Sequence, residues 1–528
     1  MKSIQSRTRE FSSDRSANDT KLELVREALA SLYQAGGSDY SARVANVGHQ
    51  RRLSKATLLG IACVCGPLLA STASAADSIN TTNAPVASVT LQKPAWLTDV
   101  SVGVKESYDV NVFESGLSPS QAASFPSPPV AGSVLALKGV NSFVTTVSPK
   151  VGVDFVPLLG DQTILKTLTL VYAPDFVTYH DADSESYDAQ RVTAAAKGKV
   201  DDLSFNLSDS FTYIDGSKYA PTYPGDLLSA FATAADRERR EQVQDRSNVS
   251  FQYDQDAWFL RPTASLLYYN LGTAQYFSAG YQNYVNRYDV NGGLDLGYKL
   301  EPQFALTLGY RYGHQDQAEY TFGPAYASTY AIAAAHSPND YQRVLLGFEG
   351  KPWDWLSASL QIGPDFRSFD STAPIDNKNP VTYYGEATLS ATVTPKDTIT
   401  FKYKQWEWVS STGLVPYFDS TFDLSYTRKV TDALSVTLGG KALGADYNPN
   451  NVATQSGDLL GDRCDRDDWQ YTASIGLQYA FNAHFSTSLG YSYDFGVDEQ
   501  DNLPAGAAGY QPRSFGHQLV SLGAIFKF

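Results

Sequence analysis

The alternation of apolar and polar residues along most of this chain is the feature that most constrains its fold. Between Tyr471 and Phe481 every second residue is apolar, and mostly threonine, serine, glycine or glutamine lie between them. The pattern resumes from Phe485 to Phe495 after a connection of three residues. Because successive side chains of a β-strand point to opposite faces, each run predicts a strand with one apolar and one polar face. The short connection predicts a tight antiparallel hairpin.

Comparable runs fill residues 98–528, and each is long enough to cross a bilayer as a tilted strand. We expect strands near 99–112, 142–156, 163–178, 187–199, 202–213, 246–254, 258–270, 286–299, 303–314, 340–351, 355–368, 381–394, 397–410, 417–429, 433–446, 469–481, 485–496 and 515–528. Short connections alternate with long ones, and the long ones fall near 113–141, 214–245, 314–339, 445–468 and 496–514. Membrane barrels show this asymmetry, with short periplasmic turns and long surface loops.

These patterns predict an all-β fold, a transmembrane antiparallel up-and-down β-barrel of about 18 strands, within a range of about 16 to 20. Mean hydropathy is −0.27 and no run of 18 apolar residues follows residue 76, which argues against transmembrane helices. Tyrosine (34) and phenylalanine (26) are abundant, as interfacial aromatic belts require. We expect six tryptophans in these belts: Trp258, Trp353 and Trp355 beside short turns, and Trp406, Trp408 and Trp469 beside long loops.

The chain ends on a strand-like segment in which Phe528, Phe526, Ala524 and Leu522 share one face. A terminal phenylalanine after apolar residues at every second position resembles the C-terminal strand of Gram-negative outer-membrane β-barrels, porins among them. The resemblance implies an integral outer-membrane location and makes Phe528 the assembly signal. It also implies outer-membrane lipid, lipopolysaccharide and the barrel assembly machinery as partners, with a homotrimer as an open alternative to a monomer.

The N-terminal region predicts export. Residues 53–76 (LSKATLLGIACVCGPLLASTASAA) follow two arginines and combine an apolar stretch with small residues at the end, as a cleaved signal peptide does. Residues 1–52 form a polar extension, and the true translation start is open between Met1 and a later codon. Residues 77–97 read as a periplasmic lead-in, and 98–528 as the barrel.

Charge and cysteine content exclude several other classes. The formal net charge of −15 disfavours nucleic acid as a partner. Beyond the signal peptide only Cys464 remains, so no internal disulfide is expected. Acidic residues cluster near it, including Asp465, Asp467 and Asp468, but no complete calcium-loop pattern is present, so we expect neither a metal site nor a cofactor. The five histidines beyond residue 76 show no catalytic pattern, and we expect no enzymatic activity.

The predicted inner faces are polar and charged. An 18-stranded barrel is too wide for side chains to fill, and unpaired charges require water, so the interior is predicted to be a hydrated lumen. The residues expected to line it are Lys105, Asp289, Asp295, Arg311, Lys402 and Lys404.

A basic run in the third long loop, 214–245, supplies a candidate constriction. Arg237, Arg239 and Arg240 follow a helix-compatible stretch, and the position of the loop resembles that of the porin loop that folds into the barrel. The alternative is a solvated charge run on a surface loop. The sequence therefore favours a porin-like channel for passive diffusion of small hydrophilic solutes. A structural or adhesive barrel that anchors a surface layer or a partner protein is the alternative.

Overall fold

The barrel unit comprises Leu91–Phe528, and the computed structural model describes residues 93–114, 140–160, 164–217, 239–271, 286–318, 320–321, 334–335, 337–373, 377–409, 416–446, 465–501 and 514–528. The predicted extension, the signal peptide and nearly all of the lead-in lie outside these residues, as do Arg237 and Cys464. No helix in the described ranges is long and apolar enough to cross a membrane.

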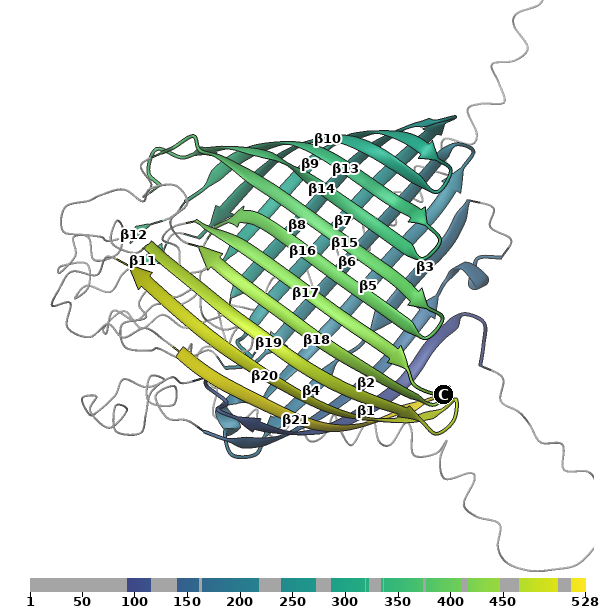
Figure 1. Ribbon diagram of the computed structural model, residues 1–528, viewed down its shortest axis with the longest axis vertical. Helices are drawn as coiled ribbons and strands as arrows, with labels where there is room; N and C mark the ends of the chain where they lie inside the picture. The colour runs from purple at the N-terminus through teal and green to yellow at the C-terminus, as the bar shows by residue number, and fades with distance from the viewer. Residues whose placement is uncertain are drawn as a thin grey trace, which may run out of the picture. The chain divides into compact units, whose positions relative to one another are not determined.

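The described strands follow the chain in order around one sheet (Figure 1). They are β1 (Leu97–Val110), β2 (Ser142–Asp154), β3 (Leu165–Tyr172), β4 (Asp175–Tyr179), β5 (Tyr187–Val200), β6 (Leu203–Asp215), β7 (Gln242–Gln255), β8 (Trp258–Leu271), β9 (Arg287–Glu301), β10 (Phe304–Gln317), β13 (Asn339–Trp353), β14 (Leu356–Phe369), β15 (Val381–Thr394), β16 (Asp397–Trp408), β17 (Tyr417–Lys429), β18 (Leu434–Asp446), β19 (Asp465–Ala480), β20 (Phe485–Asp501) and β21 (Ser514–Lys527). Two 3-10 turns, η2 (Val156–Leu158) and η3 (Asp183–Glu185), and a separate hairpin of β11 (Tyr320–Thr321) and β12 (Ala334–Ala335) complete the described elements.

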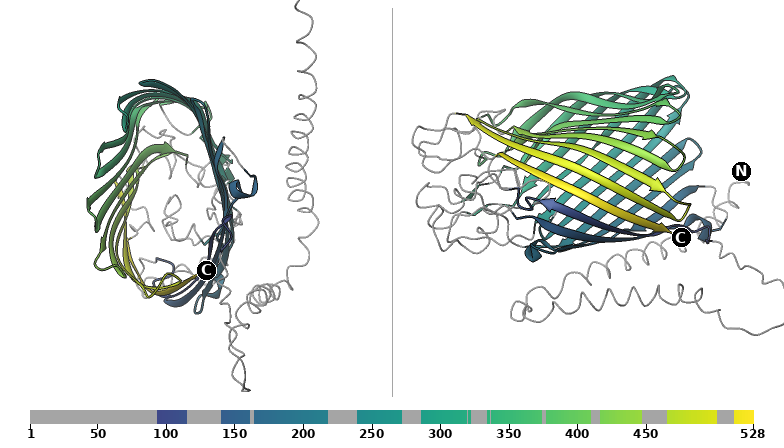
Figure 2. Two further views of the ribbon diagram at one scale, coloured as in Figure 1. Left: turned by 90° about the vertical axis from the view of Figure 1, so that its right-hand side faces the viewer. Right: turned by 60° about the horizontal axis from the view of Figure 1, so that its bottom comes forward.

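The sheet closes on itself. β1 pairs antiparallel with β21, from Ser101 opposite Lys527 to Val110 opposite Gln518, and the other strands of this sheet are paired in chain order, with β13 following β10. β3 and β4 together occupy one position between β2 and β5, so the 19 strands fill 18 positions in the described barrel. Pro174 separates the two halves, since proline has no N–H for the ladder. Figure 2 shows the strands closing into a barrel of oval section. The predicted fold class and strand number are confirmed.

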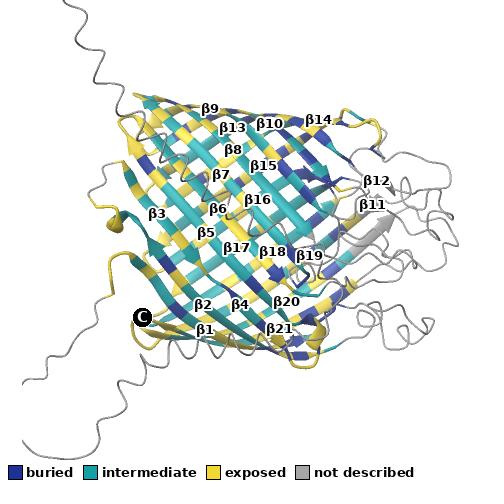
Figure 3. Cartoon of the chain, turned by 180° about the vertical axis from the view of Figure 1, so that it is seen from behind, coloured by how far each residue is buried: buried dark blue, intermediate teal, exposed yellow. Residues whose placement is uncertain are grey.

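The burial pattern of the barrel is the reverse of that of a soluble globular protein, because apolar side chains are exposed on the outer face and many polar ones are buried inside. Along β10, Leu306 and Leu308 are 46% and 50% exposed, whereas the alternate residues Ala305 and Thr307 are 5% and 6% exposed. Exposed and buried residues alternate in this way along most strands, and buried residues gather toward the long-loop ends (Figure 3). An apolar exterior with a polar interior suits a wall between lipid and water.

Strand ends differ from the sequence expectation mainly beside the long loops. β7 begins at Gln242 rather than 246, β19 begins at Asp465 rather than 469, and β20 runs to Asp501 rather than 496. These extensions are rich in polar residues, with one valine each in β7 and β20, because strands that project beyond lipid need no apolar side. Alternation therefore fades while the hydrogen-bonded ladder continues.

The tryptophan prediction holds beside the short turns but only in part beside the long loops, where Trp469 shares the outer face of β19 with the exposed Tyr471 and Trp406 and Trp408 do not face outward. Trp353 and Trp355 are 57% and 51% exposed and stack at 5.6 Å beside a short turn, as an aromatic belt requires. Trp406 and Trp408 are only 8% and 2% exposed, so their predicted place in the outer belt is wrong. Both side chains point into the barrel, where charged groups cover them.

Candidate functional site

The six predicted lumen-lining residues lie on the inner faces of three parts of the wall. Asp295 lies between Leu294 and Leu296, which are 42% and 45% exposed on the outer face, and it is itself 1% exposed. Lys105 likewise follows Val104, which is 48% exposed on the outside of β1. The remaining four occupy equivalent inward positions: Asp289 on β9, Arg311 on β10, and Lys402 and Lys404 on β16.

Charges at mid-height of the lumen are paired across neighbouring strands. Arg261 of β8 donates through Nε to Asp295 at 3.1 Å and through both Nη atoms to Glu349 of β13 at 2.8 and 2.7 Å. Arg311 of β10 approaches the other oxygen of Asp295 at 2.6 Å. A bidentate guanidinium–carboxylate pair is strong and directional. These ion pairs link four neighbouring strands, β8, β9, β10 and β13. The two arginines balance the two carboxylates, so little net charge remains at that level.

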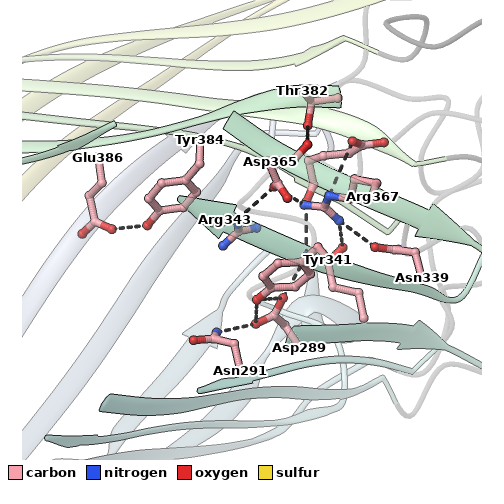
Figure 4. A network of polar contacts seen from close by, with 12 residues as sticks. Asp289, Asn291, Asn339, Tyr341, Arg343, Asp365, Arg367, Thr382, Tyr384 and Glu386 are labelled. Carbon is pink, nitrogen blue, oxygen red and sulfur yellow. Dashed lines mark hydrogen bonds and ion pairs between the residues drawn. The ribbon is translucent and has the colours of Figure 1, made fainter. Parts of the chain in front are cut away.

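A second polar network lies closer to the long loops and is drawn in Figure 4. The carboxylate of Asp289 accepts hydrogen bonds from the hydroxyl of Tyr341 at 3.0 Å and from Gln315 at 2.8 Å. Asp365 accepts from Arg343 at 2.9 Å and from Arg367 at 2.8 Å. All six side chains are at most 5% exposed. Buried charges of this kind persist only when they are hydrogen-bonded and paired, as these are.

The end of β16 is held inside the barrel by this network. Pairing between β15 and β16 stops at Gly385 opposite Gln405, and the segment Trp406–Val409, here called the inner brace, follows directly. Arg367 of β14 and Gln315 of β10 donate to the carbonyl oxygen of Glu407 at 2.8 and 3.2 Å. Trp406, Glu407 and Trp408 still pair with β17. The donors lie on inward faces of other strands, so this end of β16 turns away from β15 toward the lumen.

Aromatic and cationic side chains pack together in the inner brace. The rings of Trp406 and Trp408 stack at 4.5 Å. The guanidinium of Arg287 lies 4.8 Å from the Trp408 ring, and the ammonium of Lys404 lies 4.2 Å from the Trp406 ring. Such cation–π contacts gain strength when the pair is removed from water. They explain why these two tryptophans face inward.

Beside the inner brace lies a lumen cavity of about 390 Å³. Its lining comes from β6 to β10 on one side and from β13 to β16 on the other, with Trp406 of the inner brace among the lining residues. The charged residues that line it are Arg246, Asp289, Arg311, Arg343, Glu386 and Lys404. The cavity therefore combines three of the predicted lumen residues with three that were not predicted to line the lumen.

The structure places Arg239 and Arg240 at the base of loop 214–245. Arg240 forms a bidentate pair with Glu185 of η3 at 3.2 and 2.9 Å. Arg239 donates to the carbonyl oxygen of Val112 at 2.6 Å and to the hydroxyl of Tyr179 at 3.3 Å. The two arginines are 3% and 1% exposed. Arg237 lies outside the described residues, and the constriction role of the three arginines stays a prediction.

Sequence reasoning missed Tyr341, Arg343, Asp365 and Arg367. Their alternation with outward-facing residues places them on inner faces, and this could be predicted from the sequence. Their contacts with one another and with the inner brace depend on strand register and could not be predicted from the sequence. Among the described residues, no group of three or more histidine, cysteine, aspartate and glutamate side chains is placed to hold a metal ion.

Comparisons with known proteins give solved structures only. No family model matches the chain, and no curated protein matches it. The outer-membrane protein OpdK of Pseudomonas aeruginosa is 10% identical, with a TM-score of 0.36, over 81% of this chain and 99% of that one. OccK2 (OpdF) of the same species, solved with glucuronate, is 10% identical, with a TM-score of 0.36, over 81% and 98%. The siderophore receptor PirA of Acinetobacter baumannii is 9% identical, with a TM-score of 0.37, over 82% and 81%.

The geometry of the chain itself defines its class. A closed antiparallel wall, an apolar exterior, a charged interior, and short turns opposite long loops together characterise an integral outer-membrane β-barrel.

Proposed function

We propose that this protein is an outer-membrane channel through which small hydrophilic solutes diffuse passively. The observation that carries the proposal is the charged inner wall. The interior faces hold Lys105, Lys402 and Lys404 at exposed or half-buried positions, and such groups need water around them. A barrel with 18 strand positions is wide enough to leave an aqueous path.

We propose no catalytic role. Acyl-transfer sites need a histidine that accepts a proton from a nucleophile and is oriented by an acid. His517 contacts Asp109 and Asp494, both at 2.9 Å, and His314 contacts Asp340 at 2.8 Å. His180 approaches the hydroxyl of Thr145 at 2.8 Å, but that hydroxyl donates to Glu106, an arrangement that leaves no poised nucleophile.

Single-channel recording tests the proposal. The full-length protein would be purified from outer membranes in detergent and inserted into a planar bilayer. We expect stable conductance steps, and a salt gradient then gives the ion selectivity. A folded barrel that shifts in a heat-modifiability gel but conducts no current contradicts the channel and favours the structural or adhesive alternative.

A matched pair of variants excludes contaminating pores. Thr388 of β15 pairs with Lys402 on the inner face, whereas the adjacent Leu389 is 37% exposed on the outer face. Thr388→Trp should lower the conductance, because the indole narrows the lumen, and Leu389→Trp should leave it unchanged. Equal conductance in both variants would assign the current to another protein.

A further inference from the structure

We propose that the outer wall of β9, β10 and β13, next to the long loops, docks the saccharide headgroup of a glycolipid in the outer leaflet. The inference concerns the lipid-facing side of the barrel and holds whether or not the lumen conducts. Three observations carry it: a gradient from apolar to polar side chains along the wall, exposed tyrosines among groups that suit hydroxyls, and outer faces without basic residues.

The outer face of β10 changes in character from the short turn toward the long loop, in the order Leu306, Leu308, Tyr310, Tyr312, His314 and Asp316. The adjacent face of β13 follows the same order, with Leu346, Val344, Gln342 and Asp340. Apolar side chains suit acyl chains, tyrosine suits the interface, and charged side chains suit the headgroup layer. The boundary between acyl chains and headgroups therefore crosses this wall at Tyr310 and Tyr312.

Five side chains form a connected group at this boundary, here called the tyrosine patch: Tyr310, Tyr312, His314, Asp340 and Gln342. The hydroxyl of Tyr310 donates to Gln342 at 3.1 Å, and Nδ1 of His314 lies 2.8 Å from Asp340. The carboxylate of Asp340 also lies close to the hydroxyl of Tyr312. Tyr310 and Tyr312 are 44% and 50% exposed, so a ligand outside the wall can reach both rings.

The hydrogen-bonding groups of the tyrosine patch suit sugar hydroxyls. Gln342 accepts through its amide oxygen and keeps two N–H donors for another partner. The carboxylate of Asp340 is an acceptor, and the hydroxyl of Tyr312 can donate or accept. Each hydroxyl of a sugar both donates and accepts, so neighbouring hydroxyls are satisfied by a surface that offers both kinds of group. A lipid phosphate needs donors and finds an acceptor in Asp340.

The ring of Tyr312 has little side-chain cover on the side of β9. The partner of Tyr312 in β9 is Gly292, and the partner of Gly292 in β8 is Ala264. Apart from its chain neighbours, only the carbonyl oxygen of Thr263, at 3.6 Å, lies within 4 Å of where a Cβ of Gly292 would stand. A sugar can therefore pack its C–H groups on this ring, which presents an apolar body with a polar end.

The charges on this wall favour the saccharide over the phosphate of a glycolipid. The outer faces of β9, β10 and β13 carry no lysine or arginine. Asp316 and Asp340 lie on the loop half of these faces, and both would repel a lipid phosphate. Leu306 and Leu308 lie below the patch on the same face and offer apolar surface to an acyl chain. An amphiphile with an uncharged sugar headgroup fits this combination.

Native mass spectrometry of the full-length protein in a zwitterionic detergent without sugar tests the proposal. The probes are dodecyl maltoside and dodecyl phosphate, which share one alkyl chain and differ in headgroup. We expect the barrel to retain dodecyl maltoside in preference to dodecyl phosphate. Equal retention of the two probes, or preference for the phosphate, would overturn the proposal. Displacement of dodecyl maltoside by an equal concentration of free maltose would overturn it as well, since the site would then take soluble sugar.

A matched pair of variants locates the headgroup. Tyr312→Leu should lower retention of dodecyl maltoside by roughly fivefold, because the ring and a hydroxyl partner are lost. The leucine suits a lipid-facing position, and a heat-modifiability gel verifies the fold. Tyr383→Leu is the control, since Tyr383 is 69% exposed on the outer face of β15 near a long loop and forms no side-chain hydrogen bond among the described residues. Equal losses in both variants would reduce the patch to an ordinary aromatic belt.

A charge reversal and a crosslinking measurement examine the other occupants. Asp340→Lys replaces a carboxylate by a cation and should raise retention of dodecyl phosphate, because the headgroup then meets a counter-ion. Unchanged retention of both probes in this variant would place the headgroup elsewhere and overturn the proposal. A crosslinked dimer that Tyr312→Leu abolishes would put a second barrel on the patch, with the same consequence.

Discussion

Nη1 of Arg287, on β9, donates a 2.8 Å hydrogen bond to the carbonyl oxygen of Val409, the residue that follows β16. The two strands are not neighbours in the sheet, because β10, β13, β14 and β15 lie between them. The same guanidinium also reaches the hydroxyl of Tyr417 at 3.4 Å. This contact spans the inside of the barrel and fixes one side of the lumen relative to another.

Replacing Arg287 with alanine should loosen the inner brace. The change removes the donor to Val409 and the cation that covers Trp408, and it leaves a buried carbonyl unsatisfied. We expect a loss of about 1–3 kcal/mol in unfolding free energy and noisier open-channel current. Thermal unfolding and single-channel recording measure the two effects. Arg428→Ala is the control, since that side chain is 55% exposed beside a short turn, and quiet current in both variants would contradict the role of the brace.

Removing the indole of Trp406 should widen the lumen. Trp406 lines the cavity and is held inside by Lys404 and by the stacked ring of Trp408. We expect a higher single-channel conductance for Trp406→Ala. Tyr403→Ala provides the comparison, because Tyr403 lies on the outer face of the same strand, opposite Phe422. Equal changes in both variants would mean that conductance responds to general loosening of β16 and not to lumen width.

Breaking the buried ion-pair network should cost far more than breaking an exposed pair. Asp365 is fully buried and holds both Arg343 and Arg367, so Asp365→Ala leaves two buried guanidiniums short of a counter-ion. We expect a loss of about 3–5 kcal/mol in unfolding free energy. Asp99→Ala breaks a 2.6 Å ion pair with Lys150, in which the Asp99 side chain is 33% exposed and the Lys150 side chain 44% exposed. This change should cost below about 1 kcal/mol. Urea titration measures both values, and similar losses would refute the distinction.

The sequence predicts most of this fold because every strand of a barrel wall must present one face to lipid and the other to water. Lipid outside and water inside impose a period of two on every strand, so the faces of β9 and β10 can be assigned without coordinates. The inner brace could not be predicted in this way. Its donors, Arg287, Gln315 and Arg367, come from three different strands, and their meeting point depends on register and on strand tilt. Trp406 was misassigned because tryptophan near a strand end usually marks the interfacial belt.

Carboxylates on the lipid-facing wall make a last prediction possible. Asp209 lies on the outer face of β6, between Leu207 and Phe211, and accepts a 2.6 Å hydrogen bond from Ser247 of β7. Glu106 lies on the outer face of β1 and accepts a 2.6 Å hydrogen bond from Thr145 of β2. A charged group facing lipid is unfavourable even when one hydroxyl satisfies part of it.

Asp209→Leu should therefore stabilise the isolated barrel, by on the order of 1–2 kcal/mol, since acidic residues cost less than basic ones on a lipid face. Equilibrium unfolding in lipid vesicles measures the change. The control is Asp295→Leu, which should destabilise the barrel because it strands Arg261 and Arg311 in the lumen. The variant Asp209→Leu could instead destabilise the barrel and also lower the mass of the species trapped by chemical crosslinking. That result would show that this part of the wall contacts another subunit and not lipid.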